Sequence, residues 1–363
     1  MADFEADPHP CKVSLIAGAY REENGKPWVL PTVEKAKEHL REATHEYLGI
    51  AGSPSFINLA KDLLFGPVAS RLEDNCASIQ TVSGTGANHL AATFLARRLR
   101  PNRVLIPAPT WINHKTIWET AGVKVAEYPY YCSATKKIDI VGMLNALDHA
   151  EPNEVVILQA CARNPTGVDL SKSQWVQVAD LVRRKKLFVV FDSAYQGFAT
   201  GDLEGDAWAI RLFTENVLAF DTHPGLCVTV ILEEFWAVRE LVAIARAEYS
   251  NPPRFGASIV ETILLDQDLR AQWISDLETM SSRIRSMRRE LRQRLEKETQ
   301  HDWAHVETQI GMFSYAGLTK EQVSRLRSDF HVYLLPSGRL SLCGLNEGNV
   351  QYVAHAIGEV TKS

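Results

Sequence analysis

Short apolar runs separated by helical patterns are the feature of this sequence that most limits its possible folds. Five such runs are typical of buried strands, at residues 79–82, 104–106, 155–158, 187–191 and 228–232. Helical periodicity lies between many of them. Strands that are apolar on both faces usually belong to a parallel sheet that helices cover on each side. The sequence therefore predicts an α/β fold with a mostly parallel central sheet.

The pattern changes after a long helix that is predicted for residues 277–295. Its apolar stripe repeats every three or four positions, at Leu277, Met280, Ile284, Met287, Leu291 and Leu295. A strand at 313–315, a helix from Thr319 and a strand at 332–335 follow it. We therefore expect a large domain at 28–280 and a smaller α+β domain formed by 1–27 and 281–363.

Composition narrows the range of functions. The formal net charge of −5 gives no general attraction to nucleic acid or to an anionic membrane. The apolar runs are too short to span a bilayer, and the acidic N-terminal segment lacks the features of a secretory signal. Six scattered cysteines without a C-x-x-C pair favour reduced packing residues. We expect a cytoplasmic protein that binds neither nucleic acid nor membrane.

Two groups of polar residues follow predicted strands. Ser83-Gly84-Thr85-Gly86-Ala87 opens a helical stretch, where small residues and a helix N-terminus can hold an anion. Asp192 ends the strand at 187–191, and Tyr195 follows three residues later. Ligands of open α/β sheets bind beyond the carboxyl ends of strands, and a carboxylate there can pair with a protonated ring nitrogen. A tight turn and a helix N-cap are the structural alternatives.

Two further turns carry polar groups. Asn164-Pro165-Thr166-Gly167 follows the strand at 155–158, and Pro336-Ser337-Gly338-Arg339 lies near the C-terminus. Each is by itself only a turn signal. His301 and His305 have the spacing of helical metal ligands, but no third ligand is evident in the sequence. We interpret them as surface histidines and predict no metal site.

Together these pieces resemble the aspartate aminotransferases, class I of the fold-type I pyridoxal phosphate (PLP) enzymes. The matching stretches include Gly18-Ala19-Tyr20-Arg21, His45-Glu46-Tyr47-Leu48, Pro109-Thr110-Trp111, Asn113-His114, Asn164-Pro165-Thr166-Gly167, Phe191-Asp192-Ser193-Ala194-Tyr195-Gln196-Gly197-Phe198, Ser250-Asn251-Pro252-Pro253 and Tyr333-Leu334-Leu335-Pro336-Ser337-Gly338-Arg339. They follow the family order along nearly the whole chain. The resemblance implies the fold-type I architecture.

The resemblance also implies a role for each matching residue. The residues that would hold PLP are Ser83, Gly84, Thr85 and Tyr47 at its phosphate, and Trp111, Asn164, Asp192 and Tyr195 at its ring. Arg339 would bind the α-carboxylate of a substrate and Arg246 its side-chain carboxylate, beside Trp111 and Asn164. In the family, Tyr47 and Arg246 correspond to residues lent by a second subunit. A homodimer that binds a small carboxylate is therefore expected.

The resemblance fails at the residue on which the family's chemistry depends. The family has a Ser-x-Ser-Lys segment followed by a phosphate-binding arginine. The corresponding segment of this chain, residues 217–227, is shorter, and no lysine occurs from 187 to 296. That lysine normally forms a Schiff base with PLP and moves the substrate proton. Gln159 and Arg163 also replace histidines that usually lie near the ring. The sequence predicts that the catalytic lysine is missing and that PLP could bind only noncovalently.

These departures predict an enzyme that uses the altered site without PLP. We expect isomerisation, cyclisation or addition on a carboxylate-bearing small molecule. His223, in the shortened segment, is the predicted general acid or base, with Asp192 and Tyr195 as its partners. A loop role for His223 is the alternative. Three other interpretations stay open: a ligand-binding protein without chemistry, an aminotransferase that uses noncovalent PLP, and a gene sequence that omits the lysine segment.

Overall fold

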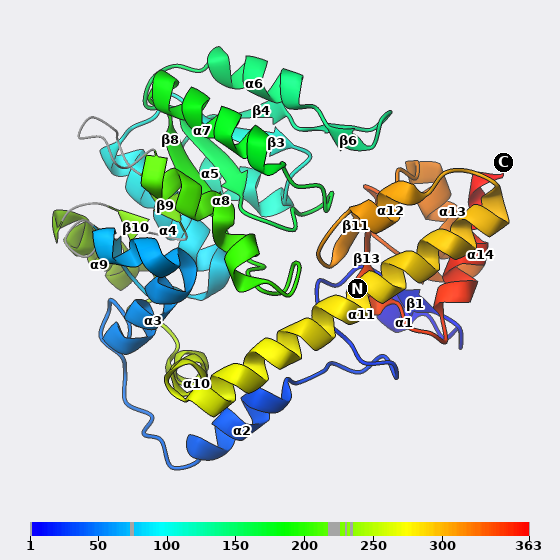
Figure 1. Ribbon diagram of the computed structural model, residues 1–363, viewed down its shortest axis with the longest axis horizontal. Helices are drawn as coiled ribbons and strands as arrows, with labels where there is room; N and C mark the ends of the chain where they lie inside the picture. Colours follow the sequence, from blue (N-terminus) through cyan, green and yellow to red (C-terminus); the bar gives the residue numbers. More distant parts are fainter. Residues whose placement is uncertain (1, 73–75, 217–225, 229–230, 233–234, 363) are drawn as a thin grey trace.

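A five-stranded parallel sheet lies among helices in the upper left part of Figure 1, apart from the C-terminal elements at the right. The computed structural model describes residues 2–72, 76–216, 226–228, 231–232 and 235–362. The sheet runs in the order β4 (Val125–Pro129), β3 (Val104–Ala108), β7 (Val155–Gln159), β8 (Phe188–Asp192) and β9 (Leu226–Val228). The predicted parallel sheet is therefore confirmed. The register of β7 and β8 pairs Gln159 with Asp192, which brings the carboxyl ends of these strands side by side.

Helices cover both faces of this sheet because alternate side chains of each strand point to opposite sides. Val156 and Leu158 of β7 pack in a core with α6 (Ile140–Asp148), α7 (Lys172–Lys185) and α8 (Leu203–Asn216). Val155 and Ile157 pack on the other face, against α4 (Ser83–Arg98), α5 (Ile112–Thr120) and α9 (Phe235–Glu248). This double burial explains why β7 and β8 are apolar at every position before their polar last residues, Gln159 and Asp192.

A separate apolar core lies in the C-terminal part of the chain. Its elements are β1 (Val13–Ser14), α12 (Ala304–Thr308), β11 (Phe313–Tyr315), α13 (Lys320–Phe330), β12 (Val332–Tyr333), β13 (Arg339–Ser341), η2 (Leu342–Gly344) and α14 (Val350–Thr361). The long helix α11 (Gln267–Thr299) contributes its apolar stripe to this core and extends toward α10 (Arg254–Leu265) and α2 (Pro31–His39), as Figure 1 shows. The proposed domain boundary at 280 falls inside α11.

The remaining elements are short or flank the sheet. They are α1 (Ala2–Ala6), α3 (Pro54–Phe65), η1 (Gly66–Leu72), β2 (Ala77–Ser78), β5 (Tyr131–Cys132), β6 (Lys137–Ile138) and β10 (Ile231–Leu232). Within the described chain, no helix is long and apolar enough to cross a membrane.

Two of the predicted strands differ from the structure. The strand predicted at 79–82 is found earlier, as β2, where it pairs with β10. Gln80 lies after this strand and links two other segments: its side chain accepts from Ser53 N at 3.1 Å and donates to Pro253 O at 2.8 Å. The run at 228–232 is divided between β9 and β10, which lie in different sheets. Apolar composition marked these segments as buried but did not determine their partners.

Candidate active site

A cavity of about 330 Å³ lies where the carboxyl ends of β7 and β8 meet the start of α4. It brings together residues that the sequence analysis had selected from five separate segments. Those that line it are Ser83, Gly84, Thr85, Trp111, Asn164, Asp192, Tyr195 and Arg339. These predicted residues therefore line a single cavity.

Asp192 ends β8 and is held from behind by a histidine. Its Oδ2 atom lies 3.0 Å from Nε2 of His114, which is fully buried on α5. The other ring nitrogen, Nδ1, lies 2.8 Å from the hydroxyl of Thr110. One carboxylate oxygen of Asp192 is thus engaged, and the second is left for a group in the cavity. The sequence gives no role to His114 beyond its place in the Asn113-His114 motif; its signal is its position on the first turn of α5, close to Trp111.

Arg339 reaches the cavity from β13, far along the chain. Its Nη1 donates to Asn164 Oδ1 at 3.2 Å and its Nη2 donates to Ile16 O at 2.7 Å. The guanidinium carbon lies 4.1 Å from the centre of the Phe313 ring. The buried Nε has no hydrogen-bond partner within the described chain, and burial lowers the pKa of Arg339. This desolvated guanidinium therefore has hydrogen-bonding capacity for an anion.

Tyr195 and Trp111 supply the aromatic part of the lining. Burial raises the pKa of Tyr195 to about 12, and the charge of Asp192 acts in the same direction, so the phenol stays protonated near neutral pH. Trp111 precedes α5, and its ring meets that of His114 edge to face at a centroid distance of 5.4 Å. A flat ring that carries a hydroxyl would find an aromatic surface and a phenol here.

The first turn of α4 forms the polar end of the cavity. Ser83, Gly84 and Thr85 are the first residues of this helix rather than a turn before it, and no side chain caps its N-terminus. A Cβ atom added at Gly84 would meet nothing within 4 Å, so the backbone is open to the cavity. First-turn N–H groups lack helical partners, and the helix dipole favours an anion beside them. A phosphate fits this end.

Tyr47 and Arg246 do not line the described cavity. The Tyr47 side chain is 85% exposed, and Arg246 Nη1 donates to Ser250 Oγ at 2.6 Å on the surface. Asn251 Nδ2 donates to Leu48 O at 2.6 Å, which places the segments of these two residues side by side. Both residues therefore belong to one exposed region outside this chain's own cavity.

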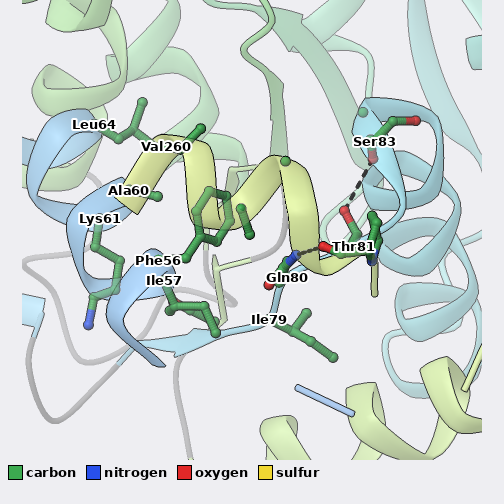
Figure 2. A pocket seen from close by; sticks show the side chains of 15 residues that line it. Phe56, Ile57, Ala60, Lys61, Leu64, Ile79, Gln80, Thr81, Ser83 and Val260 are labelled. Atoms are coloured by element: carbon green, nitrogen blue, oxygen red, sulfur yellow. Dashed lines mark hydrogen bonds between the residues drawn. The ribbon is translucent and has the colours of Figure 1, made fainter. Parts of the chain in front are cut away.

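A second cavity, of about 410 Å³, adjoins the first and shares Ser83 and Gly84 with it. Its walls are largely apolar side chains, including Phe56, Ile57 and Val260 (Figure 2). Lys61 is the one lysine among the described residues that line the two cavities, and Figure 2 shows it across the second cavity from Ser83. The carboxylate of Asp192, the phenol of Tyr195 and the guanidinium of Arg339 converge in the first cavity, so we assign the site there.

Most of a PLP-like ligand would find complementary groups in this site. Asp192 fits a protonated ring nitrogen, Tyr195 a ring hydroxyl and the α4 N-terminus a phosphate. No lysine is among the described residues that line this cavity. His223 lies outside the described residues, as does the rest of 217–225. The described chain contains no cluster of three or more metal-ligating side chains.

Comparisons with known proteins give a consistent result over the full length. Residues 10–357 match the family "Aminotransferase class I and II". The cytoplasmic aspartate aminotransferase of Saccharomyces cerevisiae is 42% identical, with 99% of this chain and 93% of that protein covered. Its solved structure superimposes with a TM-score of 0.95 at 41% identity, covering 99% and 94% of the two chains. An aromatic-amino-acid aminotransferase from Burkholderia pseudomallei, solved with covalently bound PLP, gives a TM-score of 0.92 at 36% identity, covering 99% and 95%.

These matches confirm the predicted fold-type I architecture and correct the predicted function. The expectation of a PLP-independent isomerisation, cyclisation or addition is wrong, and so is the expectation of no cofactor or only noncovalent PLP. Similar proteins over the whole chain are named aminotransferases, and one holds PLP covalently. The error came from weighing one shortened segment above the intact residues around Asp192. The acid–base role of His223 depended on that reaction and is withdrawn with it.

Proposed function

Because this chain belongs to the class I and II aminotransferase family, we propose that it is a PLP-dependent aminotransferase of dicarboxylic amino acids. The observation that carries the proposal is the cavity in which Asp192, Tyr195 and Arg339 converge on the N-terminus of α4. One carboxylate, one phenol and one guanidinium are the groups that a protonated ring, its hydroxyl and a substrate carboxylate require. A cytoplasmic location is proposed by analogy with the yeast relative, which is named cytoplasmic.

The roles of these side chains follow from their surroundings. When bound, PLP supplies an electron-withdrawing ring that accepts electrons from the substrate and carries its amino group. Asp192 would hold the proton on the ring nitrogen with the oxygen that His114 leaves free. Tyr195, protonated near neutral pH, would donate to the ring oxygen. Arg339 would orient the substrate by its α-carboxylate.

Transamination between aspartate and 2-oxoglutarate is the direct test. We expect the purified protein to form glutamate and oxaloacetate when PLP is added, because the site has groups for both the cofactor and the acid. A coupled assay of oxaloacetate, with and without PLP, measures this. The matched variant Tyr195→Phe should retain the fold and lose part of the rate. Absence of amino transfer from any acidic or aromatic amino acid to 2-oxoglutarate at saturating PLP would refute the proposal.

A finer proposal concerns the amine that attaches the cofactor. No lysine occurs from 187 to 296, so we propose that covalent attachment of the cofactor uses a lysine outside that interval. The alignment with the yeast enzyme spans 387 positions, more than the 363 residues of this chain, so this chain lacks residues that the yeast enzyme has. In the same preparations, borohydride reduction followed by peptide mapping identifies the amine. Amino transfer without any modified lysine would contradict covalent attachment by this chain.

We also propose a homodimer in which each subunit completes the other's site. The segments that carry Tyr47 and Arg246 meet through the bond from Asn251 to Leu48, and helix α10, which follows Asn251 in the chain, exposes Phe255 by 57% and Leu265 by 66%. Large apolar side chains that are exposed beside candidate functional residues indicate a surface that another protein chain covers. A second copy related by a two-fold axis would supply both residues in return.

Substitution of Phe255 by glutamate should therefore dissociate the dimer. At micromolar concentration we expect light scattering to give a dimer for the native protein and a monomer for Phe255→Glu, with activity lowered about tenfold or more. Val141→Glu is the control: it replaces an apolar residue that is 75% exposed on α6 with the same charged one. It should change neither the dimer nor the activity. A native monomer with full activity would exclude the shared site.

A further inference from the structure

A chain of hydrogen bonds joins the two ends of the cavity through a buried glutamine. Gln159, at the end of β7, is 7% exposed. Its Nε2 donates to Thr110 Oγ1 at 3.2 Å, and Thr110 contacts His114, which contacts Asp192. On its other side it binds the backbone of Asn164, whose side chain accepts from Arg339. Gln159 therefore connects the carboxylate at one end with the guanidinium at the other.

The orientation of the Gln159 amide is fixed by groups that have a single hydrogen-bonding role. Asn164 N can only donate, and it lies 2.7 Å from Gln159 Oε1. Asn164 O can only accept, and it lies 3.1 Å from Gln159 Nε2. A reversed amide would place donor against donor and acceptor against acceptor. The second N–H of Gln159 must therefore point at the hydroxyl of Thr110.

This donation determines what Thr110 offers to His114. The threonine oxygen accepts from Gln159 and has one hydrogen of its own to donate. The hydroxyl oxygen lies 2.8 Å from Nδ1 of His114. Because the ionised Asp192 carboxylate can only accept, the ring proton of a neutral His114 lies on Nε2, and Nδ1 then accepts from the Thr110 hydroxyl. The hydrogen bonds that surround His114 thus continue through Thr110, Gln159 and Asn164 to Arg339, the residue proposed to bind a substrate carboxylate.

We propose that Gln159 is a positioning residue that fixes the tautomer of His114 and, through it, the orientation of the Asp192 carboxylate. The part of this inference that concerns cofactor binding rests on the proposed function, because Asp192 is the residue assigned to the ring nitrogen. The hydrogen-bond order itself does not depend on the reaction. In the structure, the side chain at this position accepts from the Asn164 N–H and donates to Thr110.

A glutamate at position 159 reverses the order of donors while keeping the shape of the side chain. A carboxylate at 159 accepts from Thr110, so the threonine oxygen must accept from Nδ1–H of His114. The proton preference of the histidine ring changes, although no residue that touches the ligand has been replaced. We expect Gln159→Glu to weaken PLP binding roughly tenfold, the effect of about one hydrogen bond.

Nitrogen NMR of histidine-labelled protein without cofactor tests the tautomer directly. The signals of His114 are assigned by their loss in His114→Gln. We expect protonated Nε2 and unprotonated Nδ1 in the native protein, and protonated Nδ1 in Gln159→Glu. Gln293→Glu, an exposed change on α11, adds the same charge and should leave the His114 signals and PLP affinity unaltered. Protonated Nδ1 in the native protein, or unchanged signals in Gln159→Glu, would overturn the proposal.

A second variant covers the case in which Gln159→Glu does not fold. Thr110→Val removes the hydroxyl and leaves both bonds between Gln159 and Asn164 in place. The Nδ1 signal of His114 should move to the position of a nitrogen that accepts no hydrogen bond, and an unmoved signal would reject the inference. If the native tautomer is as expected but no amino transfer occurs, the proposed function fails and this inference stands.

Discussion

Replacing Arg339 with alanine should lower kcat/KM for aspartate by roughly two to three orders of magnitude. The guanidinium is already desolvated, and two of its nitrogens are fixed by Asn164 and the carbonyl of Ile16. Its orientation is thus prepared before a substrate arrives. Removing one partner of a buried charge pair costs about 2–5 kcal/mol, and each 1.4 kcal/mol is about tenfold. Steady-state kinetics with aspartate measures the loss.

Two variants show whether charge or geometry is responsible. Arg339→Lys keeps the charge but loses the planar fork, so we expect an intermediate rate. Arg289→Ala removes an arginine of the same size whose side chain is 59% exposed on α11 and should stay within about twofold of the native rate. Because the proposed partner of Arg339 is the substrate rather than the cofactor, PLP affinity should change little. Equal kcat/KM in Arg339→Ala and the native protein would exclude it as the carboxylate ligand.

Replacing Asp192 with asparagine should release the cofactor. The residue is nearly isosteric and still accepts from His114, but it has no charge for a protonated ring nitrogen. Loss of such a partly buried pair costs about 3 kcal/mol or more, which corresponds to a loss of PLP affinity on the order of 150-fold. Quenching of tryptophan fluorescence during titration with PLP provides the measurement, since Trp111 lines the same cavity.

The control for this variant is an exposed aspartate. Asp180→Asn on α7 removes the same charge from an exposed ion pair with Arg183, and such pairs contribute little to the free energy of unfolding. It should bind PLP as the native protein does. Native affinity in Asp192→Asn would mean that this carboxylate does not face the ring nitrogen, and the assignment of the cavity would fail with it.

The two variants also separate the ends of the cavity. Arg339→Ala should lose substrate binding while it retains PLP, and Asp192→Asn should lose PLP first. Gln159 is connected to both ends, so Gln159→Glu should show a smaller change in PLP affinity than Asp192→Asn. This order of effects distinguishes a residue that contacts the cofactor from one that acts through His114.

Much of the site could be predicted because its residues belong to local motifs. Asp192 ends an apolar strand, and Ser83-Gly84-Thr85 opens a helix, so each position follows from the chain around it. An inference from one local segment also led to the wrong prediction, a reaction without PLP. The lysine-free interval is a true feature of the sequence, but a shortened segment does not say what the rest of the site retains. The full-length match to aminotransferases corrected that inference.

By itself, the sequence determined the parallel sheet and the positions of its polar strand ends, because alternate burial on both faces requires continuous apolar runs. Only the tertiary structure decided which of those ends meet. The pairing of Gln159 with Asp192 depends on the register of β7 and β8, and Arg339 meets Asn164 across 175 residues of chain. The hydrogen-bond order through Thr110 and His114 is likewise invisible in sequence, since it depends on which atom of each side chain faces its neighbour.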